Sequence, residues 1–135
     1  MTNQELITLA KEAREFSHSP ISKFKVGAAL LTSDGKVFTG CNIEDSSGVG
    51  LTNICAERCA IMKAISEGYN DFVSIAVVGG KDELINCLPC GICRQYLNSF
   101  APHIKIISLD NDGLKEHSLE DLLPYRFNEN FDGEL

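Results

Sequence analysis

The sequence predicts an α/β fold, a three-layer α/β/α sandwich built around a mixed five-stranded sheet. Helical and extended segments alternate along the 135 residues in the order α-β-β-α-β-α-β-β-α. An Asp-Gly turn joins the first two strands into an antiparallel hairpin, whereas helices separate the next strands, so the sheet should be mixed and covered on both faces. With 44% hydrophobic residues the chain can bury one core, and we expect a single domain over residues 1–135.

The first helix is expected over residues 3–17, with Thr2 or Asn3 as its cap and Ser19-Pro20 ending it. Apolar residues recur there at helical spacing, namely at Leu6, Leu9, Ala10, Ala13 and Phe16.

Five strands and three more helices follow. The strands are expected at residues 25–33, 36–43, 73–80, 104–109 and 114–117, and the helices at 55–67, 91–99 and 118–123. The run 73–80 is apolar throughout, which indicates a central strand. Gly68 would close the second helix, and Ser118 with Asp121 would cap the last one.

Charge and composition restrict the classes of function. The formal net charge is −7, and a basic stripe of the kind that polynucleotide binders show is missing, so a small substrate is favoured over nucleic acid. Apolar runs stay shorter than the roughly 18 residues of a membrane span, and the acidic, amphipathic N-terminus does not resemble a secretory signal. We expect a cytoplasmic protein, in which six cysteines point to metal binding or reactivity rather than disulfides.

The sequence PCGIC, residues 89–93, places two cysteines at the start of a helix. A helix N-terminus favours anions, so both thiols there tend to ionise, as zinc ligands must. A redox dithiol, or two buried cysteines without a role, are the alternatives for this motif alone.

A third cysteine, Cys55, also lies where a helix begins. Helices that follow parallel strands start at the same edge of a sheet, so Cys55 can meet Cys90 and Cys93 there. Three thiolates would leave one tetrahedral position open, as in a catalytic zinc site. Glu57 can share this site only if Cys55 lies in the cap or first turn, because residues i and i+2 of a regular helix face apart. Alternatively, Glu57 is a first-turn acid that the helix dipole stabilises.

A structural zinc site is the second alternative. Cys59 lies one turn after Cys55 on the same helix face, and either Cys59 or Cys87 could be a fourth thiolate ligand. Such a site would give no reason for Glu57, or for the polar residues Asn42 and Glu44 at the end of a strand.

Several motifs together resemble the small homotetrameric cytidine deaminases. They are CAER at 55–58, PCGICRQ at 89–95, SPISKFKVGAAL at 19–30, TGCNIE at 39–44 and LLPYRF at 122–127. A Cys or His followed by x-Glu and then PCxxC is the known signature of zinc deaminases. The resemblance implies a Zn²⁺ enzyme of pyrimidine salvage that converts cytidine and deoxycytidine to uridine and deoxyuridine with release of ammonia.

The resemblance also implies roles for single residues. Glu57 would carry protons between water and the pyrimidine, while Arg58 would hydrogen-bond the thiolates. The implied zinc ligands are Cys55, Cys90 and Cys93. The implied substrate residues are Phe24, Asn42, Glu44 and Phe127, of which Phe127 would reach the substrate of a neighbouring subunit. The residues that would support the site are Arg58, Arg94 and Gln95.

Four departures from the family pattern leave the substrate open, and one of them is the absence of an aromatic residue after the serine of the Asn-x-Glu loop. Ile21 stands where tyrosine is usual, Cys59 replaces a threonine, and the loop 45–54 is two residues longer than expected. The alternative substrate is another aminopyrimidine nucleoside, such as blasticidin S or a modified cytidine. A structural-zinc or redox-dithiol protein is the non-enzyme alternative.

Overall fold

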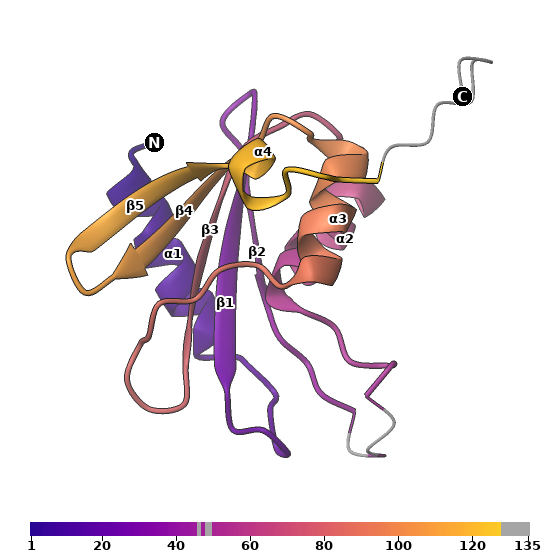
Figure 1. The fold of residues 1–135 in the computed structure, drawn as a ribbon. Coiled ribbons are helices and arrows are strands. Elements are labelled where there is room, and N and C mark those ends of the chain that lie inside the picture. Colours follow the sequence, from indigo (N-terminus) through magenta and orange to yellow (C-terminus); the bar gives the residue numbers. More distant parts are fainter. Residues whose placement is uncertain (46, 48–49, 128–135) are drawn as a thin grey trace.

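Five strands form one mixed sheet in the order β2-β1-β3-β4-β5 (Figure 1). The computed structural model describes residues 1–45, 47 and 50–127. Its elements are α1 (Asn3–Arg14), β1 (Lys25–Thr32), β2 (Val37–Cys41), α2 (Ala56–Ser66), β3 (Phe72–Gly80), α3 (Gly91–Phe100), β4 (Lys105–Asp110), β5 (Gly113–Ser118) and α4 (Leu119–Leu122). Strands β3 and β4 pair in parallel and the other neighbours pair antiparallel, so the predicted element order and mixed sheet are confirmed.

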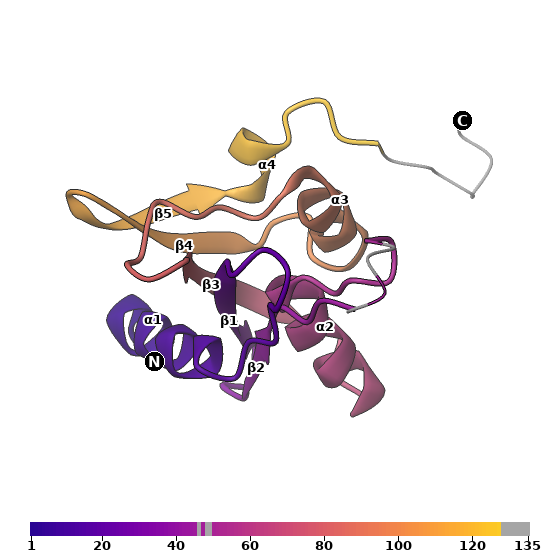
Figure 2. The same ribbon diagram turned by 90° about the horizontal axis from the view of Figure 1, so that it is seen from below.

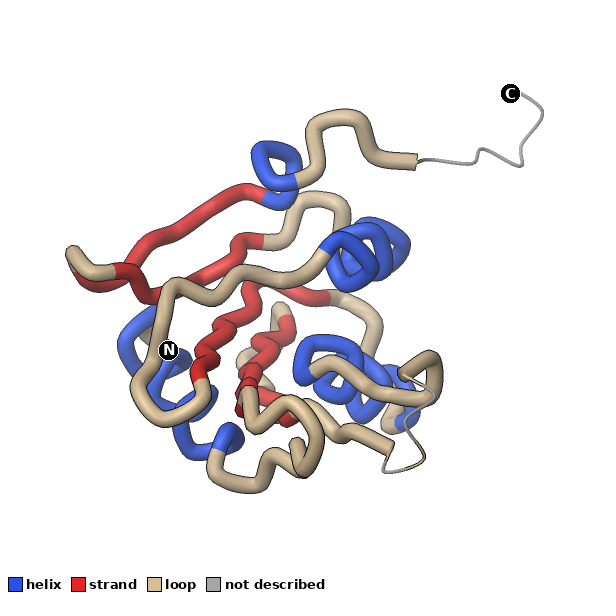
Figure 3. Tube along the Cα trace, turned by 60° about the horizontal axis from the view of Figure 1, so that its bottom comes forward, coloured by secondary structure: helices blue, strands red, loops and turns tan. Residues whose placement is uncertain are grey.

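Helices cover both faces of this sheet, which confirms the three-layer prediction. Alternate residues of β1 show the division: Ala28 and Leu30 belong to the core that α2 and α3 cover, whereas Ala29 packs under α1. Figure 2 shows α1 on one side of the strands and α2 with α3 on the other, and Figure 3 shows the same layering from a second direction. Both faces of β1 and β3 are buried, which is why their sequences are almost continuously apolar.

The first helix is shorter than predicted. Thr2 caps it through a capping box with Glu5, as expected, but the helix ends at Arg14. There the Arg14 guanidinium group donates hydrogen bonds to the carbonyl oxygens of Lys25 and Gly80, at 3.0 and 2.7 Å. The chain then turns, and Phe16 is 81% exposed. The expectation that Phe16 belongs to the apolar face was therefore wrong.

Gly27 lets α1 lie directly on β1. A Cβ atom at this position would lie 2.0 Å from the carbonyl oxygen of Ala10 and 2.5 Å from the amide nitrogen of Arg14. Because both neighbours are backbone atoms, the helix would have to shift as a unit. We expect Gly27→Ala to lower the free energy of unfolding by at least about 1–3 kcal/mol, the usual cost of overpacking. Urea denaturation measures this, and an unchanged midpoint would contradict the close contact.

The end of the described chain runs past α3. Ser118 caps α4 by accepting a hydrogen bond from the amide of Asp121, as predicted. Residues 124–127 follow without regular structure, and the remainder of the predicted irregular tail, 128–135, lies outside the described residues. Across the described ranges, the helices are too short or too polar to cross a membrane.

The topology sets the position of the site. Strand β1 pairs antiparallel with both β2 and β3, so β2 and β3 run in the same direction. The helices α2 and α3 follow these two strands and therefore begin at the same edge of the sheet.

Candidate metal centre and substrate pocket

Three thiols converge where α2 and α3 begin. Cys55 and Cys90 are the N-cap residues of the two helices, and Cys93 lies in the first turn of α3. Their sulfur atoms all lie within 4.8 Å of one another, with 3.9 Å between those of Cys55 and Cys90. Two sulfur ligands at about 2.3 Å from a tetrahedral zinc ion would be about 3.8 Å apart, so the cluster has the size and donor set for zinc.

Cys55 points into this cluster because it precedes the helix instead of belonging to it. Its φ of −75° and ψ of 152° are extended backbone values. This is the geometry that the shared site of Cys55 and Glu57 requires, and the structure places both residues on the wall of one pocket.

The electrostatics of the cluster favour an anion. A hydrogen bond from Cys93 is the largest cause that lowers the pKa of Cys55, to about 5. The guanidinium group of Arg58 adds to it, with Nη2 3.4 Å from the Cys55 sulfur. The pKa of Cys93 is raised by the same hydrogen bond to Cys55. Arg58 thus supplies positive charge where three thiolates around a divalent ion would leave an excess negative charge.

Neither Cys59 nor Cys87, the two candidates for a fourth thiolate ligand, belongs to the three-thiol cluster. Among the described residues, which include all six cysteines, the possible metal cluster consists of Cys55, Cys90 and Cys93 alone. Cys59 is one turn further along α2. Cys87 lines the pocket as a protonated thiol, since burial raises its pKa to about 11. A three-thiol cluster beside a pocket is the arrangement of an open, catalytic metal site.

Glu57 is the acid next to this cluster. Its side chain is 4% exposed and borders the pocket. Burial raises its pKa to about 7. A carboxyl group with a pKa near neutrality can both accept and release a proton at neutral pH, as general acid-base catalysis requires.

The pocket has a volume of about 280 Å³, near the lower end of the range for small-molecule sites. Its walls come from the start of β1, the end of β2, the start of α2 and the segment before α3. The lining residues are Phe24, Val26, Asn42, Glu44, Asn53, Ile54, Cys55, Ala56, Glu57, Cys87, Leu88 and Cys90. Eight residues were expected to touch metal, water or substrate, and six of them line this pocket. The other two, Cys93 and Phe127, do not line it.

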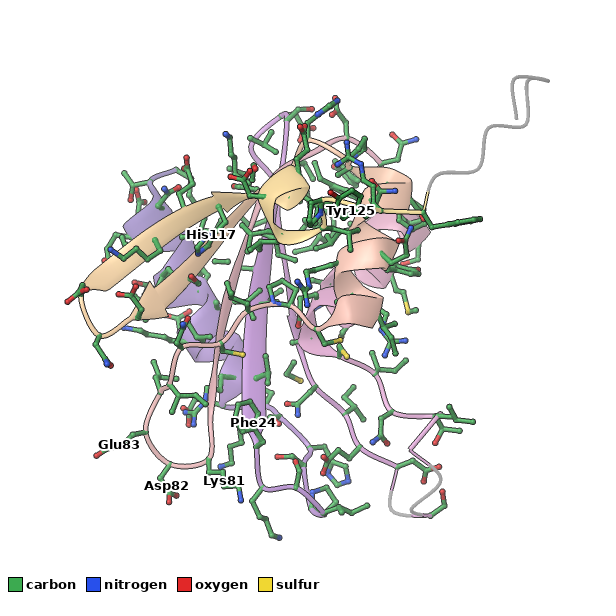
Figure 4. The ribbon with its side chains drawn as sticks, viewed as in Figure 1. Phe24, Lys81, Asp82, Glu83, His117 and Tyr125 are labelled. Atoms are coloured by element: carbon green, nitrogen blue, oxygen red, sulfur yellow. The ribbon has the colours of Figure 1, made fainter. Side chains whose placement is uncertain are left out.

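Phe24 lies immediately before β1, beside the loop that carries Lys81, Asp82 and Glu83 (Figure 4). It extends over Gly79 of β3, where an added Cβ atom would lie 3.1 Å from Phe24 Cε1 and 2.8 Å from Cys87 Sγ. The missing side chain at Gly79 makes room for both pocket residues.

Glu44 is an ionised carboxylate that already accepts hydrogen bonds from Ile21 and Ser22. Hydrogen bonds from Ser22 are the largest cause that lowers its pKa. Oε1 accepts from the amides of Ile21 and Ser22 at 3.0 and 3.1 Å. These bonds hold the turn before Phe24, in which Lys23 has the unusual φ of 61°. Because an ionised carboxylate has about four acceptor sites, Glu44 keeps acceptor capacity for the pocket.

The structure does not bring three other residues to the pocket. Phe127 is 67% exposed, and its backbone is held by the side chain of Gln95, which donates to its carbonyl at 2.7 Å and accepts from its amide at 3.1 Å. Arg94 donates to the carbonyl oxygen of Leu122 at 2.6 Å. Within the described chain, Arg94 and Gln95 thus attach the C-terminal segment to α3 and make no side-chain hydrogen bond to a thiol.

Sequence reasoning missed several wall residues. Cys87, Leu88 and Asn53 were not expected to face a substrate, although each lies within three residues of an expected zinc ligand. That proximity was the available signal. Of the long loop, residues 46, 48 and 49 lie outside the described residues.

Comparison with known proteins identifies the family. Residues 1–108, which contain all three clustered cysteines, match the family described as "Cytidine and deoxycytidylate deaminase zinc-binding region". The chain belongs to the cytidine and deoxycytidylate deaminase family. A cytidine deaminase from Halalkalibacterium halodurans is 46% identical over 129 residues, covering 94% of this chain and 95% of that protein.

Structure and a further relative agree with this family. The crystal structure of a cytidine deaminase from Burkholderia pseudomallei superposes with a TM-score of 0.85 at 42% identity, covering 94% of this chain and 100% of that one. A blasticidin-S deaminase from Bacillus cereus is 31% identical over 132 residues, covering 93% of this chain and 92% of that protein. As a member of this deaminase family, the chain is a zinc-binding enzyme. The structural-zinc and redox-dithiol alternatives are therefore rejected.

Proposed function

We propose that the pocket hydrolyses cytidine and deoxycytidine to uridine and deoxyuridine. One water is consumed and one ammonia is released for each nucleoside. The single observation that carries this proposal is a buried carboxyl group, Glu57, on the wall of a nucleoside-sized pocket next to three clustered thiols.

Cys55, Cys90 and Cys93 are the proposed zinc ligands. Bound zinc would supply the Lewis acidity that activates water at neutral pH. Arg58 balances the charge of the thiolates through its contact with Cys55.

Glu57 moves the protons of the reaction. Its carboxylate takes a proton from the attacking water and passes it to pyrimidine N3 as the new carbon–oxygen bond forms at C4. Glu57 then takes the proton of the new C4 hydroxyl group and transfers it to the departing amine, so that the C4–N bond breaks, ammonia leaves and C4 becomes the carbonyl carbon of uridine. A pKa near 7 suits both the uptake and the release of a proton by Glu57. Because Glu57 is buried, its carboxyl group is shielded from proton exchange with bulk water.

Phe24, Asn42 and Glu44 are the proposed substrate residues. They line the side of the pocket that β1 and β2 contribute. Phe24 offers an apolar ring surface, whereas Asn42 and Glu44 offer polar atoms for the sugar hydroxyls.

The choice of cytidine over blasticidin S follows the relatives, since the cytidine deaminase named above is the more similar of the two. We expect kcat/KM for ammonia release to be highest with cytidine or deoxycytidine in a panel that also contains blasticidin S and ring-modified cytidines. A clear preference for blasticidin S would keep the zinc chemistry and overturn the substrate.

A homotetramer completes this proposal. Phe127 and Ile92 are exposed on the α3 side at 67% and 66%, and Gln95 holds the backbone of Phe127 in place. Exposed apolar side chains in a defined position suit contact with another subunit, whose pocket Phe127 would reach. Sedimentation velocity of the active enzyme tests this part, and a fully active monomer would refute it.

We place this reaction in pyrimidine salvage in the cytoplasm. Six free cysteines suit a reducing compartment. Recovery of the native protein from a membrane or secreted fraction would contradict this location.

A further inference from the structure

Asn42 is held on every side. Its amide nitrogen Nδ2 donates to the carbonyl oxygen of Phe24 at 2.7 Å, and its Oδ1 accepts from the amide of Val26 at 2.9 Å. Backbone carbonyls can only accept and backbone amides can only donate. These two contacts therefore determine which way the carboxamide points, because a flipped group would face like partners at both ends.

Ser17 occupies the remaining acceptor position of Asn42. Its hydroxyl lies 2.5 Å from Oδ1, and it comes from the turn after α1, outside the pocket wall. A carboxamide oxygen has two lone pairs. The amide of Val26 and the hydroxyl of Ser17 use both, so Oδ1 is saturated before any ligand arrives.

The second hydrogen on Nδ2 is then what Asn42 can offer to a ligand. Among the described residues, the side-chain amide donates only to Phe24. Glu44 is its complement, because an ionised carboxylate has about four acceptor sites and the hydrogen bonds from Ile21 and Ser22 leave acceptor capacity for a ligand. Residues 42 and 44 flank the isolated bridges of Ile43, and in extended backbone such neighbours face the same side.

We propose that Ser17 is a positioning residue that makes Asn42 a pure hydrogen-bond donor toward the sugar. The pocket then presents one donor and one acceptor side by side. A sugar hydroxyl matches this pair, since it can accept from Asn42 while donating to Glu44. This proposal rests on the proposed function, in which a nucleoside is the ligand.

Ser17 also makes the Nδ2–H group of Asn42 a stronger hydrogen-bond donor, although it contacts only the Oδ1 atom of that side chain. A hydrogen bond to a carboxamide oxygen polarises the group, and linked hydrogen bonds reinforce one another. Without the Ser17 hydroxyl, Oδ1 has a vacant lone pair that competes for the sugar hydroxyl's proton, and Nδ2–H becomes a weaker donor. The loss therefore falls on recognition of a hydroxyl and leaves the chemistry at Glu57 unchanged.

The test compares zinc-loaded wild type with Ser17→Ala on cytidine, 2′-deoxycytidine and 3′-deoxycytidine. We expect KM for cytidine to rise about threefold to tenfold, the range of one hydrogen bond, with kcat essentially unchanged. For the analogue that lacks the recognised hydroxyl, KM should barely change, so the preference for cytidine over that analogue should shrink. An unchanged KM, or an equal loss on all three nucleosides, would overturn the proposal.

Two comparisons separate positioning from folding. Ser17→Thr and Ser17→Val have nearly the same shape and differ in the hydroxyl, so Thr should keep the preference and Val should lose it; equal behaviour would refute the role. Ser33→Ala removes another hydroxyl hydrogen bond, to Asp71 at 2.9 Å at the far end of β1, and should leave all three KM values unchanged. If wild type releases no ammonia from any of the three, the proposed function fails instead.

Discussion

Glu57→Gln is expected to lower kcat for cytidine by about two to four orders of magnitude, the usual cost of removing a general acid-base group. Glutamine keeps the shape of the side chain but cannot carry a proton. The three thiols are untouched, so zinc content should stay at the wild-type level. Steady-state kinetics and metal analysis on the same preparation measure both quantities.

A matched control lies on the same helix. Glu67 is the exposed C-cap residue of α2, and Glu67→Gln makes the same chemical change outside the pocket. It should retain wild-type kcat. If Glu57→Gln also retained kcat, Glu57 would be a first-turn helix acid and the proposed mechanism would be wrong.

Cys55→Ser is expected to weaken zinc binding by more than the 10–100-fold that loss of a supporting residue costs, because it removes a ligand itself. Activity should disappear with the metal. Cys55 precedes α2 and makes no side-chain cap hydrogen bond, so the helix should still form, as far-ultraviolet circular dichroism can check.

Cys59→Ser is the paired experiment one turn further along α2. Cys59 is outside the thiol cluster, so zinc content and kcat should both be retained. Loss of zinc from folded Cys59→Ser would show a fourth thiolate ligand and would turn the open site into a closed structural one.

The chemistry of the cluster was predictable because it depends on short sequence spacing and on where helices begin. Cys55, Cys90 and Cys93 each lie at or next to a helix start, and parallel β2 and β3 bring those starts together. The requirement that Cys55 precede the helix followed from the two-residue separation from Glu57. The element order and the capping of α1 by Thr2 followed from similarly local signals.

The features that the sequence did not predict concern residues whose positions depend on distant contacts. Phe16 fits the helical spacing, but the hydrogen bonds of Arg14 to β1 and β3 coincide with an earlier helix end. Gln95 follows the zinc motif directly, yet its side chain reaches the backbone of Phe127, 32 residues away. The contact of Ser17 with Asn42 spans 25 residues, and no local pattern marks it.

Ammonia release from cytidine by the zinc-loaded protein tests the central claim most directly. The account predicts equal amounts of uridine and ammonia, with activity lost on removal of zinc and regained when zinc is restored. Stable zinc binding without any turnover of cytidine, deoxycytidine or a related aminopyrimidine nucleoside would contradict it.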